Sequence, residues 1–414
     1  MKLKKIYIFV PKANERYKLK IITMCIWGFS RDIMQERGAL YTSTEIYGQP
    51  ALWRKVYDKI RSEKQAVQDF LHEALANEKL QIVLTGAGSS AFICLSLHGV
   101  FLRHFKNNIS TISTTDIVTH PYDYLSRDMP VLLVSFARSG NSPESVAAAT
   151  IADQVCIKVY HLIITCDPAG ELANYQTNSQ KYVFMLPTEA NDQSLAMTGS
   201  YSGMMLAGLL IARLDEIDQL ESQILLLQGY ASKLLNKYAT DFKEIAKMDF
   251  HRAVFLGSGP LYGTATESHL KLQELTDGKV ICKKDSFLGF RHGPKAVIDG
   301  KTLVFFLFSN EPYVQQYERD LAVSVIKSKK ALYVTGLMET DITIPGMDKI
   351  FELADGESRL QEDFLPICNI IPGQMLGFFK SLQLGLSPDS PSVGGAISRV
   401  VKGVIAYHFE NQLQ

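Results

Sequence analysis

The sequence predicts an α/β protein with two parallel β-sheets, each flanked by helices on both faces as a three-layer αβα sandwich. Short apolar runs alternate with helical segments, as expected for parallel strands joined by crossover helices. The same series of strands then recurs in the second half of the chain. At 414 residues, the chain also exceeds the length that one hydrophobic core usually supports, so two domains are expected.

The elements of the first half follow in order. A helix is predicted from about Leu52, because Val56, Ile60 and Val67 share one face at helical spacing. Five strands are then predicted, with a helix from Ala91 after the first and further helices after the third and the fourth; they cover residues 81–88, 108–116, 131–137, 160–167 and 181–187. An apolar helix at 204–214 and a polar helical linker from Asp215 to Met248 complete this half.

The second half repeats the first. The run AVFLGSGPLYGTA at 253–265 matches IVLTGAGSSAFIC at 82–94, and three later strands recur in the same order at 303–312, 331–337 and 349–355. Recurrence of four strands in one order indicates a duplicated α/β domain. The predicted division is an N-terminal extension at 1–45, a first domain at 46–235, a second at 236–385 and a tail at 386–414.

Composition excludes several classes of protein. Lys+Arg and Asp+Glu both number 43, so neither a nucleic-acid nor an anionic-membrane partner is expected. The six cysteines are scattered without metal-ligand spacing, which is typical of reduced thiols in a cytoplasmic protein. The basic start MKLKKIYIFVP imitates a signal peptide, but Pro11 interrupts its apolar run, and the next run, 21–29, is too short to span a bilayer.

The segment Val131–Ser145, VLLVSFARSGNSPES, predicts an anion site. An apolar strand leads into a turn where Ser139 and Ser142 flank Gly140, and a helix follows at once. Backbone N–H groups and the positive end of the helix dipole converge at such a junction. A single serine would only indicate a helix cap. Several hydroxyls around one glycine favour a bound phosphate.

A second hydroxyl-rich loop, Gly88-Ser89-Ser90, follows the first strand and could hold the same phosphate. This turn also fits the dinucleotide fingerprint G-x-G-x-x-A, with Asp116 downstream as a ribose ligand. An NAD-binding domain is therefore an alternative. Asp116 lies late for that role, however, and a dinucleotide fold has no need of a second hydroxyl-rich loop.

The candidates for acid–base chemistry lie in the second half. In the predicted helix from Glu267 to Leu275, Lys271 and Glu274 share a face three residues apart, so they could equally form a surface ion pair. His292 lies in the tight sequence FRHGP. A lone histidine is usually structural, but one accompanied by a carboxylate and a phosphate loop is a candidate acid or base.

These motifs resemble a known family. GxGSS, SxxRSGNSPES, ESxLKxxELTxGK and FRHGPK are similar to sugar isomerase (SIS) domain proteins. More narrowly, together with AMTGSYSGMM and LGLSPDSPSVGGAISRVVKGV, they resemble the AgaS family of amino-sugar catabolism, galactosamine-6-phosphate deaminase/isomerase, also called tagatose-6-phosphate ketose/aldose isomerase. The resemblance covers the chain from about Glu45 and implies two tandem SIS domains of flavodoxin-like topology.

The resemblance also implies site residues, by similarity to the isomerase half of glucosamine-6-phosphate synthase. It implies a hexose 6-phosphate substrate, no metal and no organic cofactor, and a homodimer or homotetramer with shared sites. Glu274 would move the proton between C1 and C2, and His292 would assist ring opening from the neighbouring subunit. The phosphate contacts implied are Ser90, Arg138, Ser139 and Ser142, the sugar contact is Thr198, and Lys402 matches a lysine of the relative only with a shifted gap.

The resulting expectation is deamination of galactosamine 6-phosphate to tagatose 6-phosphate and ammonia. Without an amine at C2, the same proton transfer gives a plain ketose/aldose isomerase, which is the first alternative. A non-catalytic sugar-phosphate sensor is another, because SIS folds also serve in regulators. The sensor is disfavoured because the sequence carries no DNA-binding helix-turn-helix and no basic face.

Overall fold

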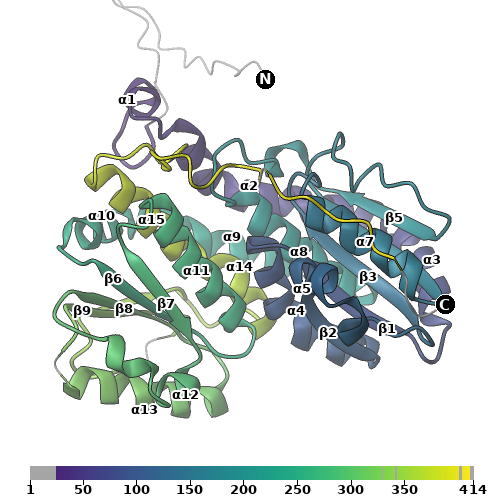
Figure 1. Cartoon of the computed structure of the whole chain (residues 1–414). Coiled ribbons are helices and arrows are strands. Elements are labelled where there is room, and N and C mark those ends of the chain that lie inside the picture. The colour runs from purple at the N-terminus through teal and green to yellow at the C-terminus, as the bar shows by residue number, and fades with distance from the viewer. Residues whose placement is uncertain (1–24, 329, 341–342, 401–402, 411–414) are drawn as a thin grey trace, which may run out of the picture.

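The computed structural model describes residues 25–328, 330–340, 343–400 and 403–410, and it contains two five-stranded sheets (Figure 1). Their strand orders are β2-β1-β3-β4-β5 and β10-β9-β8-β6-β7. Every neighbouring pair is parallel, and the two orders are the same flavodoxin-like topology used twice. The predicted duplicated α/β fold is therefore confirmed. The strands are β1 Gln81–Gly86, β2 Asn108–Ser113, β3 Pro130–Ala137, β4 Lys158–Thr165, β5 Gln180–Met185, β6 Arg252–Leu256, β7 Ile281–Asp285, β8 Thr302–Leu307, β9 Tyr333–Met338 and β10 Lys349–Glu352.

The helices outnumber those that the sequence predicts, and two of the predicted ones differ as described below. They are α1 Arg31–Glu36, α2 Leu40–Ser62, α3 Lys64–Leu75, α4 Ser89–Phe105, α5 Thr114–Thr119, α6 Pro121–Tyr124, α7 Pro143–Val155, α8 Gly199–Ala212, α9 Glu221–Asn236, α10 Ala239–Lys247, α11 Leu261–Leu275, α12 Phe287–Phe290, α13 Pro312–Ser328, α14 Leu365–Asn369 and α15 Ile371–Gln383. Short 3₁₀ turns are η1 Thr188–Ala190, η2 Leu214–Gln219, η3 Pro294–Val297 and η4 Glu362–Phe364.

The helix predicted between β4 and β5 is wrong. The chain there forms turns, and the side-chain amide of Asn174 donates to the carbonyls of Pro168 and Gly170, both at 2.9 Å. Bonds of this kind offer the backbone an alternative to a helical ladder. The first sheet therefore closes with a direct β4-to-β5 connection.

Helix α2 begins at Leu40, well before the predicted start near Leu52, and continues through Pro50. A proline has no N–H to donate to the carbonyl four residues earlier, here that of Ile46. The side-chain amide of Gln49 donates to that carbonyl instead, at 3.1 Å, and also reaches Gln374 at 2.7 Å. A buried glutamine thus donates to the carbonyl that Pro50 leaves without its backbone donor.

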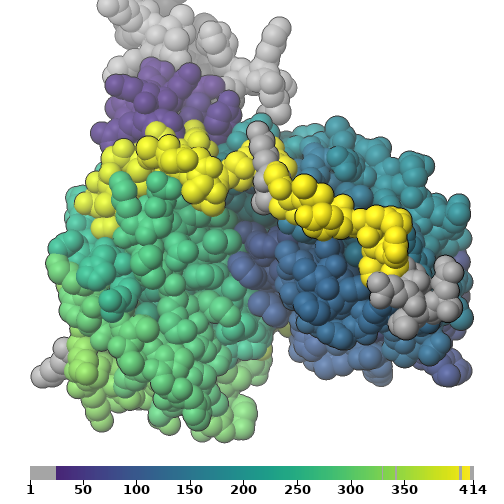
Figure 2. Space-filling view, in the orientation of Figure 1, coloured from purple at the N-terminus to yellow at the C-terminus, as the bar shows by residue number. Residues whose placement is uncertain are grey.

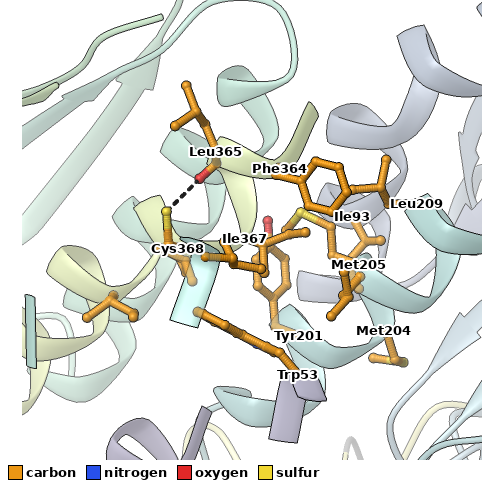
Figure 3. Close-up of a cluster of buried hydrophobic side chains, with 14 of the residues drawn as sticks. Trp53, Ile93, Tyr201, Met204, Met205, Leu209, Phe364, Leu365, Ile367 and Cys368 are labelled. Atoms are coloured by element: carbon orange, nitrogen blue, oxygen red, sulfur yellow. Dashed lines mark hydrogen bonds between the residues drawn. The ribbon is translucent and has the colours of Figure 1, made fainter. Parts of the chain in front are cut away.

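The strands place their alternate side chains on two faces, as parallel strands covered on both sides should. In β3, Leu132 and Val134 face the middle of the molecule, whereas Val131 and Leu133 pack under α7. The inward faces of both sheets belong to one continuous apolar core, built with the helices between them. Figure 3 shows part of this core, where Trp53 of α2, Tyr201 of α8, Ile367 of α14 and their neighbours meet.

Helices α4 and α11 join the two halves of the molecule by close contact. Gly263 on α11 makes this approach possible. A Cβ atom at this position would lie 2.4 Å from the carbonyl oxygen of Phe92 and 2.3 Å from the Oγ of Ser96, both on α4. Because one of these atoms is backbone, any side chain at position 263 would push the helices apart.

Residues 25–45, expected to be peripheral, pack against the rest of the molecule. The indole N–H of Trp27 donates to the carbonyl of Leu235 at 2.8 Å, and its ring contacts Phe378 and Phe379. Residues 1–24 of the predicted extension lie outside the described residues, so the predicted domain limits stay a prediction.

The tail crosses the molecule from the second sheet to the first (Figure 2). On its way Asp389 accepts a hydrogen bond from the backbone N–H of Thr42 at 2.7 Å, and Phe409 stacks near Tyr122. Within the described part of the chain, no helix has the length and apolar character needed to cross a membrane.

We predict that Gly263→Ala lowers the thermal unfolding midpoint by several degrees, because the added methyl group separates α4 from α11. The measurement is thermal unfolding of the purified variant. Gly229→Ala is the matched control, since Gly229 is exposed on α9 with no atom close to the position of a Cβ. The control should be neutral or slightly stabilising. Equal midpoints for Gly263→Ala and the wild type would contradict the steric argument.

Candidate active site

Two serine-bearing loops lie at the carboxyl ends of neighbouring strands, β1 and β3, as predicted. Gly88, at a φ of 55°, turns the chain after β1 so that the buried Ser90 falls in the first turn of α4. Gly140, at a φ of 66°, does the same after β3, and Ser142 then precedes α7. The N-termini of two helices are thereby held at one edge of the sheet, the usual ligand position in this topology.

The hydroxyls of the β3–α7 loop are engaged within the loop. The Oγ of Ser139 accepts from the N–H of Asn141 at 3.2 Å, and the Oγ of Ser142 donates to the carboxylate of Glu144 at 2.7 Å. A phosphate entering this loop would compete with the Glu144 carboxylate for the Ser142 hydroxyl.

Arg138 is buried directly behind this loop. Its guanidinium donates to the carbonyl of Leu195 at 3.1 Å, to that of Ser194 at 3.4 Å and to that of Arg399 in the tail. Burial lowers the pKa of Arg138 and Arg399 adds to this effect, whereas the charges of Asp192 and Glu274 raise it. Glu274 is thus close enough for its charge to act on Arg138, and among the described residues the guanidinium binds backbone acceptors and forms no ion pair.

Thr198 is fully buried at the N-terminus of α8. Its N–H and hydroxyl donate to Asp192, at 2.8 and 3.2 Å, and the N–H groups of Gly199 and Ser200 donate to the same carboxylate. Asp192 therefore caps α8 from outside the helix. The hydroxyl of Thr198 faces this carboxylate in the structure.

The carboxylate of Glu274 lies near the phosphate loops because α11 packs on α4. Lys271 pairs with Glu274, and its Nζ also lies 3.1 Å from Glu267 and 3.3 Å from the Oγ of Ser89. The two side chains do form the ion pair of the alternative reading, but the pair is buried and not at the surface, since Lys271 is 1% exposed and the Glu274 side chain 14%. Burial raises the pKa of Glu267 to about 7; Lys271 lowers it and Glu274 raises it further. Three ionisable groups thus share a buried site beside the first loop.

His292 is placed apart from these groups. It is exposed in the loop after α12, and its N–H donates to the carbonyl of Gly289 at 3.0 Å. In Figure 1, α12 lies below the strands of the second sheet, beside α13, whereas α7 lies over the first sheet. The structure of one chain therefore brings together Ser90, Arg138, Ser139, Ser142, Thr198 and Glu274, but not His292.

The second sheet carries carboxylates at the position that corresponds to the β3–α7 loop. After β8, the N–H of Ser309 donates to the buried Glu318 at 2.9 Å, and its hydroxyl donates to Glu362. Burial raises the pKa of Glu318 to about 8. Both donors of Ser309 at this corner are therefore already occupied by acids.

Sequence reasoning missed Glu267, Asp192 and Arg399. Glu267 precedes Lys271 by one helical turn on the same face, so helical spacing could have revealed it. Asp192 and Arg399 act through contacts distant in sequence, and no local pattern marks them. Lys402 lies outside the described residues. Within the described ranges, no three His, Cys, Asp or Glu side chains gather as metal ligands.

Comparison with known proteins agrees with this geometry. The family model described as the SIS domain matches residues 74–214. D-galactosamine-6-phosphate deaminase AgaS from Shewanella sp. (strain ANA-3) is 40% identical over 385 residues, covering 92% of this chain and 95% of the relative. The chain belongs to the AgaS family. With this membership, the dinucleotide-binding alternative is dropped.

Solved structures of AgaS-like proteins match closely. A Clostridium novyi NT protein named for tagatose-6-phosphate ketose/aldose isomerase has a TM-score of 0.91 and 39% identity, covering 94% of this chain and 100% of that one. The tagatose-6-phosphate ketose/aldose isomerase of Escherichia coli has a TM-score of 0.81 and 36% identity, covering 89% and 97%.

We predict that the double variant Ser139→Ala, Ser142→Ala raises the KM for a sugar phosphate by about 10-fold or more, because hydrogen bonds to a charged ligand are lost. Its thermal midpoint should change little, since both side chains are only half-buried. Steady-state kinetics and thermal unfolding measure the two effects. An unchanged KM would remove this loop from the substrate site.

Proposed function

We propose that this member of the AgaS family deaminates D-galactosamine 6-phosphate, giving tagatose 6-phosphate and ammonia. The observation that carries the proposal is the proximity of a carboxylate to an anion site: Glu274 pairs with Lys271, whose Nζ reaches Ser89 of the phosphate loop. The names of the curated relatives supply the substrate.

Substrate binding begins with the 6-phosphate. The N-termini of α4 and α7 provide backbone N–H groups, and Ser90, Ser139 and Ser142 provide hydroxyls. The buried cation of Arg138 supports the same anion from behind the loop. Binding energy from this remote group then holds C1 and C2 of the open-chain sugar against Glu274.

Glu274 carries out the proton transfer. As a carboxylate it removes the proton from C2 of the open-chain aldehyde, the electron pair forms the C1–C2 double bond, and O1 takes up a proton from water, which gives an enolamine. The same group returns the proton to C1 while the nitrogen releases a proton to water, which leaves a C2 ketimine and a C1 hydroxymethyl group. Water adds to C2, the C–N bond breaks, and ammonia leaves, so that the sum is amino sugar phosphate plus water giving ketose phosphate plus ammonia.

Lys271 and Glu267 stabilise the charge changes of this cycle. Lys271 is 1% exposed and lies between the two carboxylates, so its ammonium offsets their negative charge within the cluster. Glu267, with a pKa of about 7, can hold the proton that relieves the negative charge of the cluster. Because the cluster is buried, each change of charge alters the electrostatic energy of the neighbouring groups more than it would in water.

The exposed position of His292 supports an assembly of at least two subunits. A histidine that assists ring opening must reach the sugar, and among the described residues of one chain His292 forms no hydrogen bond or ion pair with the two loops or with Glu274. We propose that His292 enters the site of a neighbouring subunit in a homodimer or homotetramer. The phosphorylated substrate carries charges that retain it inside cells, so the cytoplasm is the proposed compartment.

The second candidate is ketose/aldose isomerisation without deamination, which the names of the two solved structures favour. A substrate with hydroxyl at C2 would follow the same proton transfer and release nothing. A non-catalytic sensor is disfavoured, because it would have no need of the buried Glu267–Lys271–Glu274 cluster.

The deciding experiment incubates the protein with galactosamine 6-phosphate or glucosamine 6-phosphate and measures ammonia. We expect release from galactosamine 6-phosphate. Glu274→Gln should lower kcat by about 100-fold while KM stays nearly unchanged, since glutamine keeps the size but cannot accept the proton. Glu73→Gln, an exposed site on α3, is the matched control. No ammonia from either sugar, with interconversion of tagatose 6-phosphate and an aldose phosphate, would favour the plain isomerase.

The subunit assignment of His292 predicts complementation. Mixing inactive Glu274→Gln with inactive His292→Ala should recover part of the activity, because hybrid assemblies contain sites with both wild-type groups. Activity is measured after subunit exchange has been verified with differently tagged chains. If exchange occurs and activity does not return, both residues serve the same protomer's site.

A further inference from the structure

Glu45 on α2 has a role that the proton-transfer mechanism leaves open. The half-buried carboxylate accepts hydrogen bonds from the backbone N–H of Gln193 at 2.5 Å and of Ser194 at 3.2 Å, and from the Ser194 hydroxyl. Three donors of one short segment thus converge on a single side chain from a distant helix. Such convergence fixes the segment relative to α2.

The segment that Glu45 holds, residues 190–198, contacts the site at two points. The carbonyls of Ser194 and Leu195 accept from the Arg138 guanidinium. Asp192, just before them, caps α8 through its bonds with Thr198 and its neighbours. A shift of this segment would therefore move Arg138 and the α8 N-terminus together.

We propose that Glu45 is a positioning residue for the phosphate end of the site, which it controls by holding residues 190–198 against α2. The proposal rests on the proposed function, because the ligand it concerns is the phosphate of the substrate. Glu45 touches no substrate atom in this account. Its effect should therefore appear in ligand affinity and not in the rate of proton transfer.

A cavity of about 590 Å³ lies on the outer side of Glu45, lined mainly by apolar groups of residues 26–40, of α2 and of η1. Protons can reach the carboxyl through this cavity. Three charged residues lie at the cavity wall: Arg31, and Lys55 paired with Glu189 at 2.5 Å. Asp192 lies on the inner side of Glu45. Arg138 and Arg399 donate hydrogen bonds to backbone carbonyls of residues 190–198. None of these cations pairs with Glu45 itself within the described residues.

Burial, together with the charge of Asp192, raises the pKa of Glu45 to about 8, against the hydrogen bonds from Gln193 and Ser194. The folded pKa exceeds the unfolded value of 4.5, so this group's contribution to stability decreases as the pH rises from 4.5 to about 8. Above pH 8 the ionised carboxylate repels Asp192 across the segment. Phosphate affinity should then decline. A glutamine at position 45 carries no charge, so it should remove this repulsion and the decline with it.

The test measures binding of inorganic phosphate by calorimetry and hydrogen exchange of the amides of residues 193, 194 and 198–200. Glu45→Ala should weaken phosphate binding by about 10-fold or more and speed exchange of these amides, because the donors of residues 193 and 194 lose their acceptor. Ser194→Ala should act in the same direction with a smaller effect. Asp58→Ala, an exposed carboxylate on the same helix, is the matched control and should change neither quantity.

The pH dependence and the kinetics separate positioning from a merely structural role. Glu45→Gln should bind phosphate within about threefold of the wild type at pH 7, since an amide oxygen can still accept the two backbone N–H groups. From pH 7 to pH 9 the wild type should lose affinity for phosphate relative to this variant. Phosphate itself titrates in the same way in both measurements, so the ratio of the two affinities reports only the difference between the proteins. In sugar-phosphate turnover, Glu45→Ala should raise KM with little change in kcat.

Unchanged phosphate affinity in Glu45→Ala and Ser194→Ala would overturn the proposal, as would a wild-type to Glu45→Gln ratio that stays constant from pH 7 to pH 9. A selective fall in kcat would also overturn it, because it would make Glu45 part of the chemistry. A wild-type protein that binds no phosphate would instead overturn the proposed function, and this inference with it.

Discussion

The close contact between α4 and α11 is the constraint on which the site depends. In the proposed mechanism the first repeat supplies the loops that bind phosphate and the second supplies the acid–base cluster, so neither repeat alone would hold a complete site. Gly263 allows the helices to approach until Lys271 reaches the Oγ of Ser89 at 3.3 Å. The chemistry of this protein therefore rests on a steric condition, the absence of one side chain at a helix crossing.

Much of the fold could be predicted because its signals are local. Apolar runs such as those of β1 and β3 predict buried parallel strands, and the repeated glycine turns indicate the duplication. The errors came from local patterns that side-chain hydrogen bonds to the nearby backbone override. A helix is predicted only from about Leu52, but α2 begins at Leu40 and passes through Pro50, where Gln49 donates to the carbonyl of Ile46. After β4, Asn174 turns a helix-like segment into turns by bonding the backbone.

The candidate site was predictable only where one element carries its residues. Helical spacing links Lys271 and Glu274, yet it could not show that the pair is buried, because burial depends on α4 from the other repeat. Glu45 and Asp192 meet across a large sequence separation, and neither occurs in a motif that marks the contact. His292 lies outside this group in the structure of one chain, which the tight sequence FRHGP does not reveal.

The continuous core between the two sheets changes what the duplication means. A repeated unit could be expected to survive excision, since each repeat has its own complete sheet. Here the inward face of β3 and that of β8 both belong to one apolar cluster, closed by helices from either repeat. Cutting the chain at the repeat boundary would expose that face to water. In thermodynamic terms the two repeats are no longer independent folding units, and the ancestral symmetry survives only in the order of the strands.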